Sequence, residues 1–293
     1  MIKFSHYASL YLDFKSHELK ASTLDKYTNI VLQRINPIFQ DRLIQDIKPS
    51  DVKKWLYDIT DVGSKSKRHY LGVLSGIFQE ALYDEVIEKN PVKLVKLPKN
   101  HKPIIKPFTA DEVKSIMELA INANYRFYLA IAFYTGLRSG EIIALKKDDI
   151  DLENKVLHVR KSRNRFGEST PKTRSSIREV PIIELLMPYI SELYVLHDNE
   201  YLFQTQYGLP YRDTNVFLAK FWKPALSELK ISYRRLYNTR HTFATNMLFN
   251  NLVTPLQLAH LLGHSSTQMV YEVYVKYIDS NYVDFDRSIS IYN

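Results

Sequence analysis

Apolar side chains recur at helical spacing through the first third of the chain. They fall every three or four residues in four stretches, at 4–14, 27–35, 52–56 and 71–82. This period predicts four amphipathic helices. Ser22 or Thr23 is the expected N-cap of the second helix. The fourth helix is expected to run from Ser66 to about Asp84.

A tract rich in proline and lysine follows these helices. Asn90-Pro91 ends the helical pattern, and residues 96–107 contain three prolines and four lysines. Because such a tract is extended and cannot join a helical core, it marks a domain boundary. Thr109-Ala-Asp-Glu112 is a capping box that opens a new helix. The predicted organisation is a helical domain at 1–96, a linker at 97–107 and a second domain at 108–293.

The second domain mixes helices and strands. Helical patterns fit 110–122, 125–135, 213–222, 238–250, 254–262 and 266–277, with a short helix from Ser139. Residues 155–161 and 177–182 read as two β-strands, with their connection as the tip of a hairpin. The predicted fold class is therefore mainly α with a small β-sheet.

Composition limits the class of protein. Of 293 residues, 45% are hydrophobic and none is cysteine, which excludes a disulfide framework and thiolate metal sites. No stretch offers the roughly 18 consecutive apolar residues of a membrane span, and the N-terminus lacks a secretory signal pattern. We expect a soluble intracellular protein that does not act at a membrane and needs no metal or other cofactor.

The charge pattern makes a polyanion a candidate partner. The formal charge is +8, and residues 1–107 hold 18 basic against 12 acidic side chains. Lys65, Lys67 and Arg68 fall in the first turn of a predicted helix, where cations oppose the helix dipole unless an anion is near. They are candidate contacts to DNA phosphates. The alternative is a solvated, lysine-rich surface.

Two segments of the second domain present cations on turns. In T-G-L-R-S-G-E, at 135–141, two glycines flank Arg138, whose guanidinium can bind phosphate in a planar fork. The alternative for Arg138 is a surface position at an ordinary helix corner. A tip as charged as that of the hairpin should have no core role, and should reach into nucleic acid or be mobile. Its candidate DNA-binding or catalytic residues are Arg160, Lys161, Arg163, Arg165, Lys172 and Arg174.

Two further segments lie near the C-terminus. Tyr237-Asn-Thr-Arg240-His241 opens a helix, and His264 follows Gly263, which is expected to end another helix in the left-handed conformation. The next helix carries Tyr271, Tyr274 and Tyr277. Taken singly, a histidine after a helix end is more often a capping or surface residue, and a tyrosine on an amphipathic helix is more often a core residue.

In their order along the chain, these segments resemble the motifs of the tyrosine recombinases, the phage-integrase family. T-G-L-R-S-G-E resembles the segment with the family's first arginine, P-K-T the hairpin lysine, N-T-R-H-T-F-A-T the second arginine and L-L-G-H-S-S the histidine. Each motif is weak alone, but four in order are a strong signal, and the resemblance covers the whole chain. It implies an N-terminal helical core-DNA-binding domain and a mixed α/β catalytic domain, arranged as a C-shaped clamp.

The resemblance also implies a reaction. A tyrosine attacks a DNA phosphodiester and leaves a 3′-phosphotyrosyl link and a free 5′-hydroxyl, without metal or ATP. Arg138 and Arg240 would meet the charge that builds on the phosphate oxygens. Lys172 would protonate the leaving oxygen, and His264 would bond a non-bridging oxygen. Tyr237 stands where the family often has a histidine; a phenol with an ordinary pKa near 10 suits phosphate contact rather than proton abstraction, which leaves the base unassigned.

Three tyrosines compete for the role of nucleophile. They follow His264 by 7, 10 and 13 residues: Tyr271, Tyr274 and Tyr277. A ten-residue spacing is familiar in the family, which favours Tyr274. Glu141 is expected to be a buried partner of nearby cations rather than a catalytic acid, and His241 a structural residue.

The implied partners are double-stranded DNA at a specific recombination site and further copies of the chain, as a tetramer on paired sites. An accessory protein is a further candidate, and the implied location is the cytoplasm, at the nucleoid. The chain resembles a simple recombinase of the Xer kind without an arm-type DNA-binding domain, or a truncated integrase. Integration, excision and dimer resolution all stay open. The alternatives are a type IB topoisomerase-like relaxing enzyme, a non-catalytic DNA-binding relative and a metal-dependent nuclease.

Overall fold

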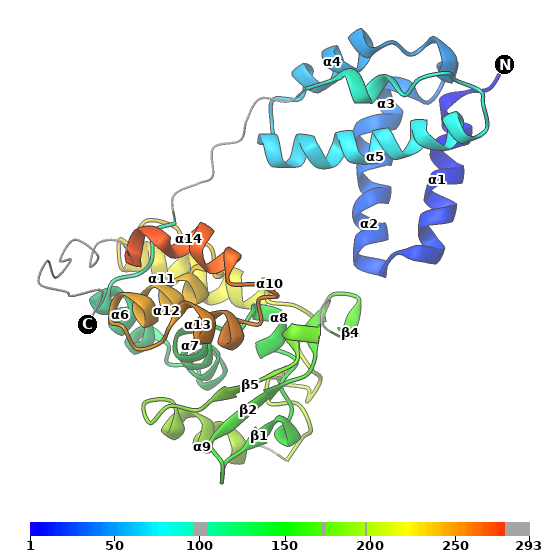
Figure 1. The fold of residues 1–293 in the computed structure, drawn as a ribbon. Coiled ribbons are helices and arrows are strands. Elements are labelled where there is room, and N and C mark those ends of the chain that lie inside the picture. The colour runs from blue at the N-terminus through cyan, green and yellow to red at the C-terminus, as the bar shows by residue number, and fades with distance from the viewer. Residues whose placement is uncertain (97–104, 171–173, 197, 279–293) are drawn as a thin grey trace, which may run out of the picture. The chain divides into compact units, whose positions relative to one another are not determined.

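The computed structural model describes residues 1–96, 105–170, 174–196 and 198–278. The chain divides into two units, Met1–Pro103 and Ile104–Asn293 (Figure 1). Both consist mainly of helices, and the second also contains small β-sheets, so the predicted fold class is confirmed. None of the described helices combines the length and apolar character needed to cross a membrane.

The first unit is a set of helices joined by short turns. They are α1 (Phe4–Glu18), α2 (Ala21–Ile30), α3 (Asn36–Phe39), α4 (Pro49–Asp58) and α5 (Ser64–Tyr83), with the π-helical η1 (Val31–Ile35) and the 3₁₀ segments η2 (Ile44–Asp46) and η3 (Pro91–Leu94). The four predicted helices are confirmed. The N-cap expected at Ser22 or Thr23 is wrong, because the Lys20 carbonyl already accepts the first helical hydrogen bonds of α2.

The contact between α1 and α5 depends on a glycine. A Cβ added to Gly76 would lie 2.4 Å from Cε2 of Tyr11. The Tyr11 ring is buried and stacks on Tyr27, with ring centroids 6.3 Å apart and planes at 7°. The bare backbone of α5 therefore lets this aromatic pair pack directly against the helix.

The second unit contains the remaining elements. Its helices are α6 (Ala110–Leu119), α7 (Ala123–Thr135), α8 (Ser139–Ile142), α9 (Met187–Val195), α10 (Asn215–Phe217), α11 (Lys223–Glu228), α12 (Asn238–Phe249), α13 (Pro255–Leu262) and α14 (Gln268–Ile278). Short helical segments are η4 (Lys147–Asp149), η5 (Arg174–Ser176) and η6 (Leu218–Trp222). The strands are β1 (Ile150–Asp151), β2 (Val156–Val159), β3 (Ser162–Asn164), β4 (Gly167–Ser169) and β5 (Arg178–Pro181).

The predicted hairpin is present but more elaborate than its pattern indicated. β2 and β5 pair antiparallel with Leu157 opposite Val180, and β1 adds an edge to give the order β1-β2-β5. The connection forms a second sheet of its own, β3 with β4. Two- and three-residue strands are too short to show alternation, so the sequence analysis missed β1, β3 and β4. It also missed α9, whose Pro188 reads as a breaker but lies in the first turn, where proline is tolerated.

The capping box that opens the second unit is confirmed. Thr109 Oγ1 accepts from the Glu112 amide at 3.2 Å, and Glu112 accepts from the Thr109 amide at 2.8 Å. Arg234 then pairs with the same carboxylate, at 2.6 Å and 2.8 Å. The start of α6 is thereby tied to the chain just before α12.

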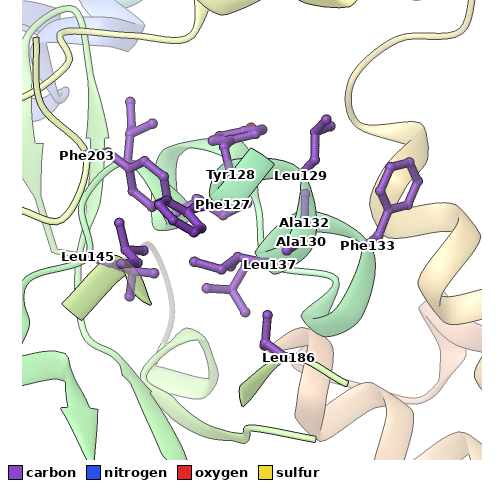
Figure 2. Packing of buried hydrophobic residues seen from close by; sticks show 14 of the residues in the cluster. Phe127, Tyr128, Leu129, Ala130, Ala132, Phe133, Leu137, Leu145, Leu186 and Phe203 are labelled. Carbon is purple, nitrogen blue, oxygen red and sulfur yellow. The ribbon is translucent and has the colours of Figure 1, made fainter. Parts of the chain in front are cut away.

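Helix α7 is surrounded on all sides by core. Each residue from Phe127 to Phe133 is at most 5% exposed, and Figure 2 shows Leu145, Leu186 and Phe203 packed around it. A helix that is apolar all round must be enclosed by other elements. Because α7 ends at Gly136, the turn that carries Arg138 starts from a rigid platform.

Alanine substitutions at the two interior glycines of α5 should have opposite effects. Gly76→Ala overpacks the Tyr11 ring and should cost about 1–3 kcal/mol of unfolding free energy. Gly72→Ala is the control, because Gly72 is exposed and a Cβ there meets nothing within 4 Å. It should stabilise the helix by about 0.5–1 kcal/mol. Urea denaturation measures both, and equal effects would contradict the proposed close packing.

Candidate active site

The first predicted arginine sits on a turn fixed by its own neighbours. Gly136 has the left-handed conformation, with φ of 64°, and Arg138 is the residue before α8. Glu141 accepts from the Arg138 amide at 2.9 Å and from its guanidinium at 2.7 Å. The Arg138 side chain keeps 34% of its surface exposed. It is therefore oriented from one side and open on the other.

The second predicted arginine is almost completely buried. Arg240, on α12, is 1% exposed and donates to the carbonyls of Gly136 at 2.9 Å and Leu262 at 2.7 Å. Its guanidinium also lies 3.0 Å from Nε2 of His264. Burial, with a smaller contribution from Arg138, lowers the pKa of Arg240 to about 10, so it stays charged at neutral pH. These partners, found in the described part of the chain, are all uncharged.

The predicted histidine is held neutral. Burial, and then the charges of Arg240 and Arg138, lower the pKa of His264 to about 4. Its Nε2 therefore accepts from Arg240, and the proton lies on Nδ1. Nδ1 is buried and has no hydrogen-bond partner among the described residues.

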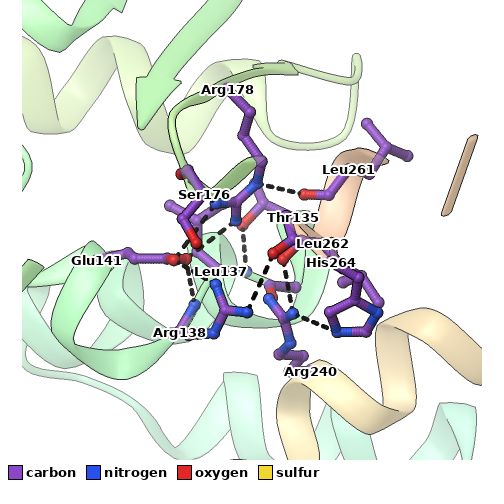
Figure 3. A network of polar contacts seen from close by, with 12 residues as sticks. Thr135, Leu137, Arg138, Glu141, Ser176, Arg178, Arg240, Leu261, Leu262 and His264 are labelled. Atoms are coloured by element: carbon purple, nitrogen blue, oxygen red, sulfur yellow. Dashed lines mark hydrogen bonds and ion pairs between the residues drawn. The ribbon is translucent and has the colours of Figure 1, made fainter. Parts of the chain in front are cut away.

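The site contains a third arginine, which was not among the predicted site residues. Arg178 opens β5, its side chain is fully buried, and it donates to both carboxylate oxygens of Glu141, at 3.0 Å and 3.3 Å (Figure 3). Strand alternation could have revealed it, because Arg178 shares the inward face with Val180 and Ile182. The expectation that Glu141 is a buried partner of cations is confirmed.

Glu141 stays ionised despite its burial. Burial favours the neutral acid, but hydrogen bonds and charge from Arg178, with the charge of Arg138, outweigh it and lower the pKa of Glu141. One carboxylate is thus shared by two guanidinium groups. It orients both without neutralising them.

The C-terminal end of α13 accepts a hydrogen bond from each of the three arginines. The carbonyls of residues 261–263 accept, in order, from Arg178 at 2.6 Å, Arg240 at 2.7 Å and Arg138 at 3.4 Å. These carbonyls form the C-terminal end of a helix, which carries partial negative charge. The helix end therefore offsets part of the repulsion among the cations (Figure 3).

Gly263 is required for this convergence in two ways. Its φ is 64°, a conformation that a side chain disfavours. A Cβ there would also lie 2.9 Å from Nη1 of Arg178. The predicted end of α13 is confirmed, and the glycine also makes room for the buried arginine.

Tyr274 and Tyr237 meet at one imidazole. The Tyr274 side chain is 2% exposed, and its hydroxyl lies 2.7 Å from Nδ1 of His241. Tyr237 is 42% exposed and turns its ring edge to the same imidazole, with centroids 5.0 Å apart. Tyr271 is 48% exposed. The Tyr277 side chain lies outside the described residues.

The candidate DNA-binding cations of the hairpin tip have partners within the protein. Lys161 lies 3.1 Å and Arg163 lies 3.7 Å from Glu168, and Arg163 also packs over the Tyr201 ring. Arg160 pairs with Asp149 at 3.3 Å. Arg163 therefore packs against the rest of the protein, with 17% of its side chain exposed.

The structure describes only some of the remaining candidate cations. Arg165 packs over the neighbouring Phe166 ring at 4.8 Å. Lys172 and the Arg174 side chain lie outside the described residues. At the start of α5, the Lys67 ammonium donates to the Leu56 carbonyl at 3.0 Å. Lys65 and Arg68 lie in the same first turn. In the described residues no group of three or more His, Asp or Glu side chains could hold a metal ion.

Comparison with known families agrees with this fold and site. Residues 106–280 match the phage integrase family, and residues 3–59 match the phage integrase N-terminal SAM-like domain. The chain therefore belongs to the phage integrase family, and the resemblance inferred from its motifs is confirmed.

Several curated proteins are similar to it. A putative prophage phiRv2 integrase of Mycobacterium tuberculosis is 32% identical over 204 residues, covering 67% of this chain and 53% of that protein. A tyrosine recombinase XerC-like protein of Caldanaerobacter subterraneus is 30% identical, covering 80% and 68%. The ICEBs1 integrase of Bacillus subtilis is 28% identical, covering 93% and 78%. The chain thus spans about half the length of the mycobacterial relative.

Solved structures share the fold. The Tn1549 transposon integrase in complex with a circular intermediate DNA matches with a TM-score of 0.77 at 23% identity, covering 92% of this chain and 94% of that one. A lambda integrase dimer bound to a COC′ core site matches with a TM-score of 0.76 at 20% identity, covering 99% and 81%.

Removing the shared carboxylate should destabilise the second unit strongly. Glu141→Ala leaves the Arg178 guanidinium buried without its countercharge, which should cost about 3–5 kcal/mol. Glu184→Ala is the control, since it removes an exposed ion pair with Lys155 and should leave stability unchanged. Urea denaturation of both variants gives the comparison. A small loss for Glu141→Ala would show that the buried pair does not hold these elements together.

The two neutral histidines should make stability fall on acidification. The pKa values of His241 and His264 are lowered to about 4, below the ordinary value of 6.5, so the unfolded chain binds their protons first. Stability should decrease as pH falls from about 6.5 to about 4, with at most about 1.4 kcal/mol per pH unit from each histidine. Urea denaturation at successive pH values measures this slope, and His264→Asn should reduce it. An unchanged slope in that variant would contradict a buried neutral His264.

Proposed function

We propose that this chain is a site-specific DNA recombinase that cuts and rejoins strands through a 3′-phosphotyrosyl intermediate. The observation that carries the proposal is the buried Arg240 guanidinium, which is charged, has neutral hydrogen-bond partners and lies beside Arg138 and His264. A fixed cation of this kind is suited to an anion that develops charge during reaction. A phosphodiester under attack is such an anion.

Each residue of the site has a proposed role. Arg138 and Arg240 hold the non-bridging oxygens, and Glu141 and the end of α13 keep both guanidinium groups in place before the DNA arrives. His264 adds a hydrogen bond to the phosphate, because the bound anion offsets the cations that now hold it neutral. Tyr237, which is partly exposed, contacts the phosphate as well.

Tyr274 is the proposed nucleophile. Its hydroxyl is held by His241, the neighbour of Arg240 in sequence, whereas Tyr271 is half exposed. By family position, Lys172 donates a proton to the leaving 5′-oxygen. Bond energy is kept in the phosphotyrosyl link, so this chemistry needs no metal, ATP or other cofactor.

The two units take different parts in the proposed complex. We assign 1–96 to core-DNA binding, 97–107 to a linker and 108–293 to catalysis. Lys65, Lys67 and Arg68 contact phosphates from the first unit, and the hairpin cations contact them from the second. The family match to the SAM-like domain supports the first assignment.

The proposed assembly is a tetramer on two paired copies of one recombination site, acting on double-stranded DNA at the nucleoid. Its support is a lambda integrase tetramer bound to a Holliday junction, which shares the fold with a TM-score of 0.76. A prophage integrase among the relatives and a transposon integrase among the similar structures favour DNA of a mobile element as the target.

Trapping the covalent intermediate tests the proposal. The protein is incubated in EDTA with lightly nicked genomic fragments of its source organism, because a nick near the cut lets the 5′-hydroxyl fragment leave and prevents rejoining. Wild type should form a detergent-resistant protein–DNA adduct whose phosphotyrosyl peptide contains Tyr274, and sequencing the DNA gives the site. Tyr274→Phe should abolish the adduct.

Tyr271→Phe is the matched control and should leave the yield within about twofold of wild type. An adduct that persists in Tyr274→Phe would move the nucleophile to Tyr271 or Tyr277. Absence of any wild-type adduct would favour a non-catalytic DNA-binding relative. Relaxation of plasmids that lack the site would favour a topoisomerase-like enzyme.

A further inference from the structure

One hydrogen bond at the site has no part in the roles given so far. His241 follows Arg240 on α12, and its Nδ1 lies 2.7 Å from the hydroxyl of Tyr274 on α14. The two rings are 5.8 Å apart and tilted by 60°. The hydroxyl belongs to the proposed nucleophile, and the sequence analysis treated His241 as structural.

The direction of this hydrogen bond follows from the charge state of the imidazole. Burial, and then the charge of Arg240, lower the pKa of His241 to about 4, so the ring is neutral at pH 7. A neutral imidazole has one nitrogen that donates and one that accepts. The phenol donates its proton to Nδ1, and the ring proton of His241 lies on Nε2.

The position that often supplies a histidine in the family cannot act as the base in this chain. Tyr237 occupies it, and a phenol is a poor proton acceptor at neutral pH. Tyr237 instead packs its ring against the His241 imidazole, with centroids 5.0 Å apart and ring planes at 81°. The imidazole therefore contacts Tyr237, the residue just before α12, and Tyr274 on α14, and it lies within the electrostatic influence of Arg240.

We propose that His241 is a catalytic residue whose Nδ1 positions the Tyr274 hydroxyl and accepts its proton as the phenol attacks DNA. The inference rests on the proposed function, and assigns the base that the replacement by Tyr237 left open. It changes His241 from a structural residue into one that touches a reacting atom.

The step balances within the residues named. The Tyr274 O–H bond breaks and its proton moves to the Nδ1 lone pair of His241. The phenolic oxygen forms a bond to phosphorus, and the bond from phosphorus to the 5′-oxygen breaks. The leaving oxygen takes a proton from Lys172. Rejoining reverses each transfer, so His241 returns the proton to Tyr274.

Phosphate binding should raise the pKa of His241 and so make it a stronger base when the substrate is bound. Arg240 is one of the two causes that lower the pKa of His241. A phosphate beside Arg240 offsets that charge, so the pKa of His241 rises when DNA is in place. Without DNA the imidazole is a weak base, and Tyr274 is buried.

Two substitutions separate proton acceptance from packing. His241→Asn can place its amide oxygen near the Nδ1 position and keep the hydrogen bond, but it cannot take the proton. His241→Leu removes both functions at similar volume. The rate of adduct formation is measured from pH 7 to 9.5 on nicked duplexes that carry the site recovered above.

Both variants should react about 10²–10⁴-fold more slowly than wild type at pH 7. Without a base the reaction requires phenolate, whose fraction rises tenfold per pH unit below the phenol pKa. Their rates should therefore rise steeply with pH while the wild-type rate stays nearly flat. A wild-type rate in His241→Asn, or slow rates that do not change with pH, would overturn the assignment.

A modified substrate distinguishes the proposed role of His241 as the base from the proposed role of Lys172 as the acid that protonates the leaving oxygen. A sulfur atom replaces the 5′ bridging oxygen at the cut, because a departing thiolate needs no proton. Lys172→Ala should then recover to near the wild-type rate, and His241→Leu should stay slow. If the rate of His241→Leu also recovers on this substrate, His241 acts on the leaving 5′-oxygen and not on the Tyr274 hydroxyl. If wild type forms no adduct at all, the proposed function fails instead.

Discussion

Three guanidinium groups, two of them buried, converge in the second unit and repel one another, and this part of the fold depends on what offsets that repulsion. Two features do so: the Glu141 carboxylate, shared by Arg138 and Arg178, and the carbonyl end of α13. Neither removes the excess of positive charge. The fold therefore holds a preorganised cation site whose remaining charge suits a phosphate, and it does so before any DNA is present.

The parts predicted from sequence are those set by local rules. The four apolar stretches of the first unit correspond to α1, α2, α4 and α5. Apolar residues spaced by three to four positions share one face only in an α-helix, so this pattern predicts the element directly. Thr109 with Glu112 and the left-handed Gly263 marked helix ends through backbone hydrogen bonding alone. The motif order located Arg138, Arg240 and His264, which the structure brings together.

The parts that escaped prediction depend on contacts between distant segments. Arg178 lies in a predicted strand whose alternation places it on the inward face, but its pairing with Glu141, 37 residues away, depends on how β5 packs against α8. His241 reads as part of a helix until α14 brings Tyr274 to its Nδ1. Arg163 was expected to reach into nucleic acid or to be mobile with the hairpin tip, and no local pattern indicated that it packs on Tyr201 and pairs with Glu168. Sequence spacing carries no information on such encounters.

The end of α13 couples the three arginines of the site to one another. Its carbonyls at 261–263 hold one arginine each, from β5, α12 and the turn before α8. If that single helical turn frays, each of the three side chains loses one hydrogen bond at the same time, while Glu141 still holds Arg138 and Arg178 and the Gly136 carbonyl still holds Arg240. Local unfolding of a few residues would thus loosen the whole cation cluster at once. One short segment therefore affects the geometry of side chains that come from three separate parts of the chain.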